Sequence, residues 1–443
     1  MYLTGNYSDD KMGANDTVQA GALHYEGCQK EKIMYKLDSR IKKTVQILWI
    51  DEDFQRGAEA KQLLEQMTEE GNADAYYFLA RCYAGPQFVN IGFGFPDDEN
   101  KCFEYLDLSI KNGSALGMFA GRRFGGYKPP NGTFVHEPYH SLKEIWEEVC
   151  HIADSGELFT KYLVANAYYY GDVAKLFEMD FSHTPPQLIT QQFRQWAETA
   201  VAMYEELLRA NMLMGLGNYI DIITSGDYGV PKNEKRAKEL RQLGADKGNP
   251  YYMVTVGEEI EKQQPEKAET YYKRALEHNY VEANFYLGRL YSLGGNGHRN
   301  LMKSRELLEK CLEAGKKTVG CNNYLGELYF YGGDGIDADY NKAFQHLFAA
   351  YKEDNHWGYA MLGTCYLKGL GTSVDYERAR TEFSRFSPNA LAALGLGEIY
   401  ANGLGVPVDI KKAMTYWDMY PDYPEIIEVK KSFKKTLFGW KRV

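Results

Sequence analysis

The sequence predicts an all-α protein, an α/α superhelical solenoid of stacked antiparallel helix pairs. Three observations predict it. A Leu-Gly-x-x-Tyr pattern recurs four times in the C-terminal half, a second glycine follows each tyrosine, and a small residue follows at a regular distance. Self-similarity with a period of about 35–45 residues is typical of proteins built from repeated helix pairs.

The first helix of each unit carries the Leu-Gly-x-x-Tyr pattern. Leucine and tyrosine at i and i+4 lie on one face of a helix, and the glycine between them lets a neighbouring helix approach closely. The second glycine ends the helix in the left-handed conformation that glycine adopts readily. The copies begin at Leu287, Leu325, Leu362 and Leu396, and their second glycines are Gly294, Gly332, Gly369 and Gly403.

The second helix of each unit follows a Gly-rich loop such as GLGTSVD or GLGVPVD. It has apolar residues at helical spacing, for example Ala343, Leu347 and Ala350. Its small residue is expected to pack against the first helix. That residue is Ser304, Ala343, Ala379 or Ala413, and the last three follow a basic residue. One such pair cannot bury its apolar faces alone, so neighbouring pairs must stack.

The segment LGLGEIYANGLGVPVDIKKAMTYW, which ends at Trp417, carries every element of the pattern. The pattern resembles the Sel-1-like repeat, a relative of the tetratricopeptide repeat with a longer loop between its helices. The resemblance implies a protein-binding solenoid. The sequence contains no phosphate-binding loop and no G-x-S-x-G motif, so we also expect no cofactor and no enzymatic activity. Weaker copies occur upstream around Gly257, Gly217, Ala165, Ala80 and Gly21.

The repeats predict three parts of the chain. Residues 1–50 form an N-terminal capping region with a degenerate first repeat, and residues 51–427 form the solenoid, with the clearest repeats at 283–420. Residues 428–443 form a basic C-terminal cap or tail. Segments 85–100, 121–140 and 172–187 are expected to be longer loops, which either carry a binding site or only vary in length.

A partner protein or peptide would bind the concave surface lined by the first helices. Relatedness to tetratricopeptide repeats implies that outward residues lie three before, one after and four after the Leu-Gly glycine. The alternative is that some of these residues pack between repeats. The predicted binding residues are Tyr77, Arg81, Tyr162, Asn166, Tyr169, Phe285, Arg289, Asn323, Glu327, Phe330, Thr364 and Glu398.

One short motif indicates a different function. His136-Glu137-Pro138-Tyr139-His140 matches H-E-x-x-H, in which two histidines on one helix bind zinc and the glutamate is the base of a hydrolase. Pro138 disfavours helix at Glu137. Ser141 with Glu144 is typical of a capping box that opens the next helix, which would leave the motif in a loop. We therefore expect no metal site and no catalytic residues.

The C-terminal segment EVKKSFKKTLFGWKRV holds six basic residues against one acid. Val429, Phe433 and Leu437 would form an apolar stripe if the segment were helical. The stripe predicts an amphipathic helix that covers the last repeat, because the end of an array needs covering. The alternative is a helix that docks on an anionic membrane surface.

Composition narrows the remaining functions. A net charge of −10 and a pI near 5.5 argue against nucleic-acid binding, which needs a basic face. The seven cysteines are scattered without a C-x-x-C pair, as expected for free thiols in a reducing compartment. The first residues have no apolar signal core, and no stretch is apolar enough to span a membrane. These features favour a cytoplasmic adaptor or scaffold, in style a bacterial one.

Overall fold

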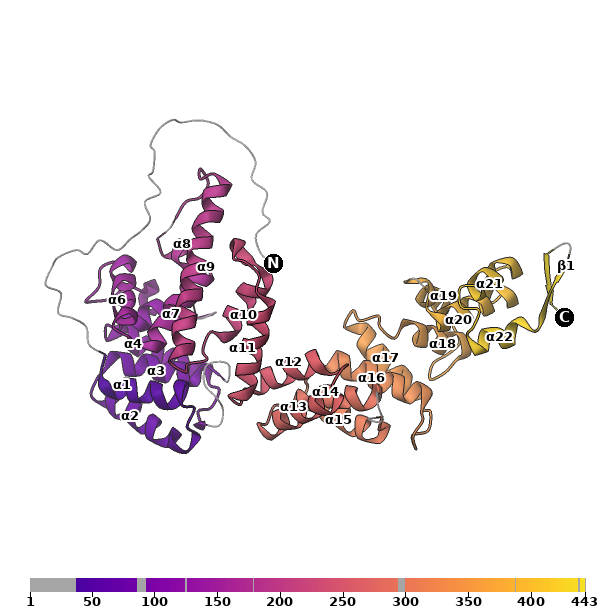
Figure 1. The fold of residues 1–443 in the computed structure, drawn as a ribbon, viewed down its shortest axis with the longest axis horizontal. Coiled ribbons are helices and arrows are strands. Elements are labelled where there is room, and N and C mark those ends of the chain that lie inside the picture. Colours follow the sequence, from indigo (N-terminus) through magenta and orange to yellow (C-terminus); the bar gives the residue numbers. More distant parts are fainter. Residues whose placement is uncertain are drawn as a thin grey trace. The chain divides into compact units, whose positions relative to one another are not determined.

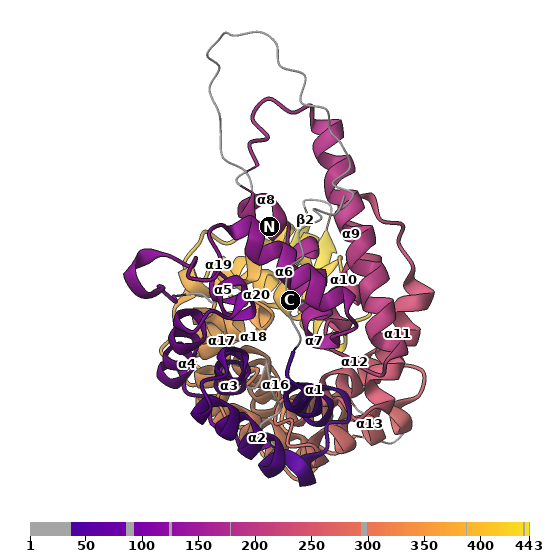
Figure 2. The ribbon, with the colours of Figure 1, turned by 90° about the vertical axis from the view of Figure 1, so that its left-hand side faces the viewer.

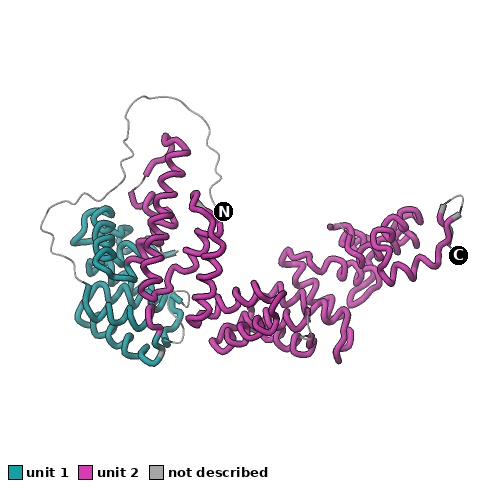
Figure 3. The backbone as a smooth tube through the Cα atoms, viewed as in Figure 1, with its two compact units in different colours: residues 1–48, 53–160 teal, residues 49–52, 161–443 magenta. Residues whose placement is uncertain are grey.

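The computed structural model describes residues 37–85, 93–123, 126–177, 179–293, 299–386, 388–436 and 439–442. The chain divides into two compact units (Figure 3). Unit 1 comprises residues 1–48 and 53–160, and unit 2 comprises residues 49–52 and 161–443.

Unit 1 is built from short helices that pack in succession. Its helices are α1 (Ser39–Val45), α2 (Gly57–Glu69), α3 (Ala73–Tyr83), α4 (Glu99–Lys111), α5 (Ala115–Gly121) and α6 (Leu142–Asp154). The helix α7 (Leu158–Tyr169) begins in unit 1 and continues into unit 2. Polar side chains accept hydrogen bonds from free backbone N–H groups at several helix starts, which fixes where these helices begin. These caps are Asp38, Asn72, Asp98, Ser114 and Ser141.

Unit 2 continues the same architecture. Its helices are α8 (Asp172–Leu176), α9 (Pro186–Arg209), α10 (Leu216–Ser225), α11 (Glu234–Asp246), α12 (Pro250–Ile260), α13 (Pro265–Glu277), α14 (Ala283–Leu293), α15 (Leu301–Glu313), α16 (Thr318–Tyr331), α17 (Tyr340–Lys352), α18 (Tyr359–Lys368), α19 (Tyr376–Ser384), α20 (Ala390–Asn402), α21 (Ile410–Trp417) and α22 (Pro424–Lys430). The N-terminal part of α9 projects beyond α10 in both views (Figures 1 and 2).

From α10 to α21 the helices form consecutive pairs, in which each helix packs against the next. We call the first helix of a pair the A helix and the second the B helix. The A helices are α10, α12, α14, α16, α18 and α20, and the B helices are α11, α13, α15, α17, α19 and α21. The predicted all-α solenoid of stacked helix pairs is therefore confirmed.

The glycine of the Leu-Gly pattern marks the closest approach within each pair. A methyl group on Gly363 would lie 2.6 Å from the Phe383 ring, and one on Gly326 would lie 2.7 Å from Leu347. Gly397 approaches Trp417 in the same way. Each contact joins an A helix to its own B helix. The predicted small residues Ser304, Ala343, Ala379 and Ala413 are fully buried.

The predicted helix ends are also present. Gly369 and Gly403 adopt left-handed conformations with φ of 68° and 67°, and their N–H groups donate back to the last turns of α18 and α20. Gly332 likewise ends α16 at positive φ. Gly294 lies outside the described residues.

The tyrosine of each Leu-Gly-x-x-Tyr copy, called here the repeat tyrosine, lies beneath a cation. That cation precedes the small residue of the B helix of the same pair, which explains the basic residue seen in the sequence. The cations are 5.6, 4.9, 5.6 and 4.1 Å from the ring centroids in the pairs Lys303–Tyr291, Lys342–Tyr329, Arg378–Tyr366 and Lys412–Tyr400.

Two repeat tyrosines also bond to the preceding repeat. The Tyr291 hydroxyl donates to Glu269 on α13 over 2.8 Å, and the Tyr329 hydroxyl donates to Glu309 on α15 over 3.0 Å. Burial and the neighbouring carboxylate raise the pKa of both phenols to about 12, so each remains a donor at neutral pH. One side chain thus connects three helices.

The three predicted loops differ in structure. In segment 85–100, of which 86–92 lie outside the described residues, Phe93 and Phe95 are buried. In segment 121–140, Gly121 ends α5 and residues 124–125 lie outside the described residues. The described remainder is irregular apart from a turn of 3-10 helix at Pro130–Gly132. Segment 172–187 is not a loop throughout, because it contains α8 and the start of α9.

The N-terminal prediction is only partly covered by the structure. Within residues 37–50, α1 is followed by a π-helical turn at Gln46–Ile50. The degenerate repeat expected around Gly21 lies outside the described residues.

The predicted C-terminal amphipathic helix is wrong. After α22 the chain forms an antiparallel hairpin of β1 (Phe433–Thr436) and β2 (Gly439–Arg442). Gly439 and the β-favouring aromatic Trp440 disfavour helix at this position. Leu437 of the expected stripe lies outside the described residues, and Phe433, which is on strand β1, packs on Trp417 with ring centroids 5.4 Å apart.

Candidate functional site

The A helices of unit 2 follow one another side by side, with direct contacts from α12 to α14, from α14 to α16 and from α18 to α20. Residues at one repeat position therefore form a row across successive helices. The position directly after the Leu-Gly glycine is occupied by Glu258, Arg289, Glu327, Thr364 and Glu398. We call this row, together with Phe285, Asn323, Tyr324, Tyr331 and Trp357, the A-helix face.

Arg289 is fixed on this face by two carboxylates. Its guanidinium donates to Glu258 over 3.1 Å and to Glu261 over 2.8 Å, both on the preceding repeat. The Tyr272 hydroxyl donates to Glu261 over 2.6 Å. Burial, and then the Glu261 carboxylate, raise the pKa of this phenol. The positive charge of Arg289 is thus neutralised within the protein.

Glu327 occupies the same position one repeat later and lacks such a partner. Among the described residues, no cation forms an ion pair with its carboxylate. Burial raises the pKa of Glu327, although the charge of Arg299 partly offsets that shift. A half-buried carboxylate without a counter-ion is costly to keep charged, and a cation brought by a ligand would lower that cost.

Asn323 lies one helical turn before Glu327 on α16. Its side-chain NH2 donates to the side-chain oxygen of Asn355 over 3.0 Å, and that oxygen also accepts from the backbone N–H of Trp357. The Asn323 side-chain oxygen is buried without a hydrogen-bond partner, and the residue is only 7% exposed. Buried acceptors are normally paired, so this oxygen is a candidate contact for a ligand N–H group.

Aromatic rings extend along the same repeats. Phe285 and Tyr324 have ring centroids 6.0 Å apart, and Tyr324 and Trp357 have centroids 5.7 Å apart. Trp357 is 48% exposed. Tyr324 and Trp357 were not among the predicted binding residues. They lie two residues before Gly326 and six residues before Gly363, and neither position was assumed to point outward.

Half of the twelve predicted binding residues are partly exposed. These are Tyr162, Tyr169, Phe285, Arg289, Glu327 and Glu398. The other half are buried. They are Tyr77, Arg81, Asn166, Asn323, Phe330 and Thr364.

The six buried residues show why the three assumed positions of each repeat (three before, one after and four after the Leu-Gly glycine) expose fewer side chains than expected. Phe330 belongs to a core cluster that includes Leu362 on the next A helix, and the Thr364 hydroxyl donates to its own helix at Ala360. The A helix α14, for example, packs against its own B helix α15 and against the neighbouring A helices α12 and α16. The positions three before and four after the Leu-Gly glycine can therefore become buried between repeats.

The N-terminal members pack within their own units. In unit 1, Tyr77 contacts Phe78 and Phe159, and the Arg81 guanidinium lies 5.4 Å from the Phe159 ring centroid. In unit 2, the Asn166 side-chain oxygen accepts from the Tyr204 hydroxyl over 2.6 Å and from Asn218 over 2.8 Å. Asn166 therefore has an internal structural role.

Unit 1 buries two carboxylates. Asp74 is 6% exposed and accepts a hydrogen bond of 2.6 Å from the Ser114 hydroxyl. Burial raises its pKa to about 6, and the nearby charges of Glu157 and Glu148 contribute. Glu157 accepts hydrogen bonds from the backbone N–H groups of Phe159 and Thr160 at the start of α7, and burial raises its pKa.

The H-E-x-x-H segment does not form a helix. His136 to His140 lie in a turn, and α6 begins at Leu142. Ser141 accepts from the Glu144 N–H over 3.2 Å, as predicted for a capping box. The Glu144 carboxylate accepts from the N–H of His140, one residue before the cap, over 2.8 Å. The described residues contain no group of three or more His, Cys, Asp or Glu side chains that could hold a metal ion.

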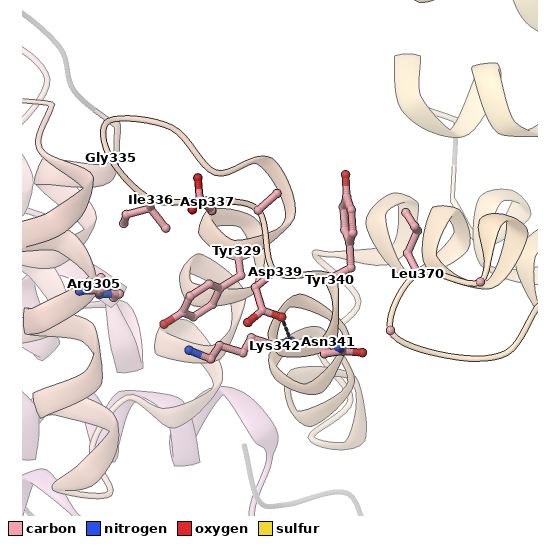
Figure 4. Close-up of a pocket in the computed structure, with 13 residues that line it drawn as sticks. Arg305, Tyr329, Gly335, Ile336, Asp337, Asp339, Tyr340, Asn341, Lys342 and Leu370 are labelled. Atoms are coloured by element: carbon pink, nitrogen blue, oxygen red, sulfur yellow. Dashed lines mark hydrogen bonds between the residues drawn. The ribbon is translucent and has the colours of Figure 1, made fainter.

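A cleft of about 650 Å³ lies elsewhere in unit 2, between the loop that precedes α17 and the loop that follows α18 (Figure 4). Arg305, Asp337 and Lys342 bring charges of both signs to it, and Asp339 caps α17 by accepting from the Lys342 N–H over 3.0 Å. The mixture favours no particular class of ligand.

Six cysteines lie in the described part of the chain, and all are free thiols. No helix among the described residues is both long and apolar enough to cross a bilayer.

The sequence profile of the Sel1 repeat matches seven segments, which together make up more than half of the chain. They are residues 73–114, 210–249, 252–280, 281–316, 320–355, 358–381 and 388–419. The chain belongs to the Sel1 repeat family. The resemblance read from the repeat tyrosines and glycines is thereby confirmed, and the matched segments from 252 onward coincide with successive A and B helices. No curated protein matches the sequence.

Several solved Sel1 repeat structures resemble the chain at low identity. The protective antigen c5321 of uropathogenic Escherichia coli, described as displaying an SLR fold, is 18% identical with a TM-score of 0.48, covering 89% of this chain and 86% of that one. A Sel1 repeat protein from Oxalobacter formigenes is 23% identical with a TM-score of 0.39, covering 50% and 92%. A Sel1 repeat protein from Klebsiella pneumoniae is 18% identical with a TM-score of 0.29, covering 44% and 96%.

Proposed function

We propose that this Sel1 repeat protein is a non-catalytic scaffold that binds a partner protein, or a peptide segment of one, on its A-helix face. Stacked helix pairs present such faces as extended binding surfaces. The observation that carries the proposal is the pair Asn323 and Glu327. These two polar side chains lie one turn apart and have groups without an internal partner.

The placement of Arg289 supports the same surface. Because Glu258 and Glu261 hold its guanidinium, the charges of this part of the face are fixed before a partner arrives. A preorganised surface loses less conformational entropy on binding than a mobile one.

We propose a cytoplasmic location because most of the described cysteine thiols are buried and unpaired. Five of the six described thiols are buried, and burial raises the pKa of Cys102 to about 11 and of Cys365 to about 12. Buried thiols with raised pKa values are unreactive and remain reduced, which suits a reducing compartment. Cys311 differs, because a hydrogen bond with Cys321 lowers its pKa.

The experiment that tests the binding surface is site-specific photocrosslinking in the source cells. A photoreactive phenylalanine would replace Tyr331 at the end of α16, which is 58% exposed. The matched control would replace Met302 on the B helix α15, which is 45% exposed. We expect a discrete crosslinked protein from position 331 only. The same set of crosslinked proteins from positions 331 and 302 would contradict binding on the A-helix face.

A further inference from the structure

Several unused groups on the A-helix face are acceptors, although the buried Arg289 Nε is a donor without a hydrogen-bond partner. The Asn323 side-chain oxygen is an acceptor without a donor, and the carboxylates of Glu327 and Glu398 have no ion-pair partner among the described residues. The exposed Trp357 ring offers a π face beside Tyr324. Acceptors, carboxylates and tryptophan rings all attract donors and cations.

The cationic group within the row is already occupied. The Arg289 guanidinium is held by two carboxylates and also lies 5.8 and 5.3 Å from the ring centroids of Phe285 and Tyr286. The exposed Lys262 and Lys368 lie at or just beyond the C-terminal ends of A helices. The exposed Lys317 at the start of α16 places its ammonium group 5.3 Å from the centroid of the Tyr286 ring, which Arg289 also contacts. The face therefore has free acceptors at its centre, whereas its central cation is neutralised.

A further carboxylate belongs to the same region. Burial raises the pKa of Tyr331 to about 12, and charges on Tyr423, Glu327 and Glu425 add to that shift. The charge of Glu425 on α22 therefore acts on the last residue of α16. Glu425 also has no ion pair among the residues that the structure describes.

We propose that the A-helix face from α14 to α20 binds an extended segment of a partner protein that carries lysine or arginine side chains. The proposal rests on the proposed function and adds the chemistry of the partner. A backbone N–H of the segment would donate to Asn323, one cation would pair with Glu327, and another would stack on Trp357. An extended segment fits because the receiving groups are spread over successive repeats.

The test is peptide selection on the full-length chain. Random peptides displayed on phage would be selected against the wild type, against Glu327→Lys with Glu398→Lys, and against a control, Glu306→Lys with Glu377→Lys. The control makes the same charge change at exposed sites on the B helices α15 and α19. Circular dichroism and thermal unfolding would establish that all three proteins are folded.

We expect peptides selected on the wild type and on the control to be enriched in lysine and arginine, and that enrichment to vanish on the A-helix variant. A selected peptide, measured by fluorescence anisotropy, should lose about tenfold or more in affinity on Glu327→Lys, equivalent to about 1.4 kcal/mol. Glu327→Gln, which keeps the side-chain shape, should show a smaller loss in the same direction.

The opposing outcomes separate the inference from the proposed function. Selection of neutral or acidic peptides that need the A-helix face would overturn the cationic segment and leave the scaffold function intact. Peptides that bind all three proteins equally, or no selected peptides at all, would overturn both. Self-association of the wild type that Glu327→Lys abolishes would make a second copy the occupant, and would also overturn the proposal.

Discussion

The ammonium group of Lys412 lies 4.1 Å from the centre of the Tyr400 ring, directly above the last repeat tyrosine. The same arrangement occurs in the three preceding repeats, always between an A helix and the B helix that follows it. Because the tyrosine is fixed by packing and the lysine comes from the partner helix, this contact helps to orient the two helices of a pair.

Lys412→Met should lower the thermal unfolding midpoint, because it removes the cation while keeping an unbranched side chain over the ring. The matched control is Lys411→Met, at an exposed neighbouring position, which should change the midpoint less. Differential scanning calorimetry of both variants would measure the difference. Equal midpoints for the two variants would contradict a stabilising contact.

Gly363→Ala should destabilise the chain by about 1–3 kcal/mol, the usual cost of overpacking, although alanine favours helix more than glycine does. The added methyl group would lie 2.6 Å from the Phe383 ring, which is fully buried and cannot move away. Urea unfolding would measure the loss. In the control Gly217→Ala, the nearest atom to the new methyl is the Tyr252 hydroxyl oxygen at 3.4 Å, so the change should be neutral or slightly stabilising.

Asp74→Asn should stabilise unit 1 near pH 7. The folded state raises the pKa of Asp74 from 3.8 to about 6, so it binds the proton more tightly than the unfolded chain does. The free energy of unfolding therefore falls as the pH rises from about 4 to about 6, and the full penalty, up to about 3 kcal/mol, is present above that window.

Thermal unfolding at several pH values would check this dependence. The stabilisation by Asp74→Asn should be largest above pH 6 and should shrink toward pH 4. Asp97→Asn, at an exposed site, serves as the control and should show little effect at any of these pH values. Stabilisation by Asp74→Asn that did not vary with pH would contradict the role of the buried charge.

Phe433→Ala should loosen the C-terminal repeat and leave the distant ones unchanged. Phe433 is 9% exposed and covers Trp417, so its loss should cost a few kcal/mol, as for other buried phenylalanines. Hydrogen exchange should become faster in α20 and α21, whereas α12 and α13 should keep their protection, because a solenoid is stabilised mainly by neighbouring contacts. Lys434→Ala, an exposed neighbour, should have little effect.

The repeated pattern predicted the helix pairs, their closest approach and their glycine ends, because each of these depends on spacing within one repeat. The buried half of the predicted binding residues could not be recognised in this way, since contacts with other segments, such as that of Asn323 with Asn355, depend on how the repeats pack together. The basic residue before Ala413 was visible, but its contact with Tyr400 depends on how two helices face each other.

The C-terminal hairpin shows a different limit on what a sequence pattern can predict. Val429, Phe433 and Leu437 match a helical period, yet the same segment can alternate as two short strands, and the stripe cannot distinguish these structures. Gly439 was the signal that favoured the strands. Packing against Trp417, which lies outside the segment, selects the side of the hairpin that becomes buried.

The bond from Tyr291 back to Glu269 crosses the boundary between two sequence repeats, so we expect the unit that unfolds cooperatively to differ from the unit repeated in the sequence. A fragment cut at Ala283, where the A helix α14 begins, would keep the tyrosine and lose its acceptor on α13. A fragment cut at Pro265 would retain both. Excised pieces of this array should therefore be more stable when they begin with a B helix, and engineered insertions of whole repeats should be joined within the pair rather than between pairs.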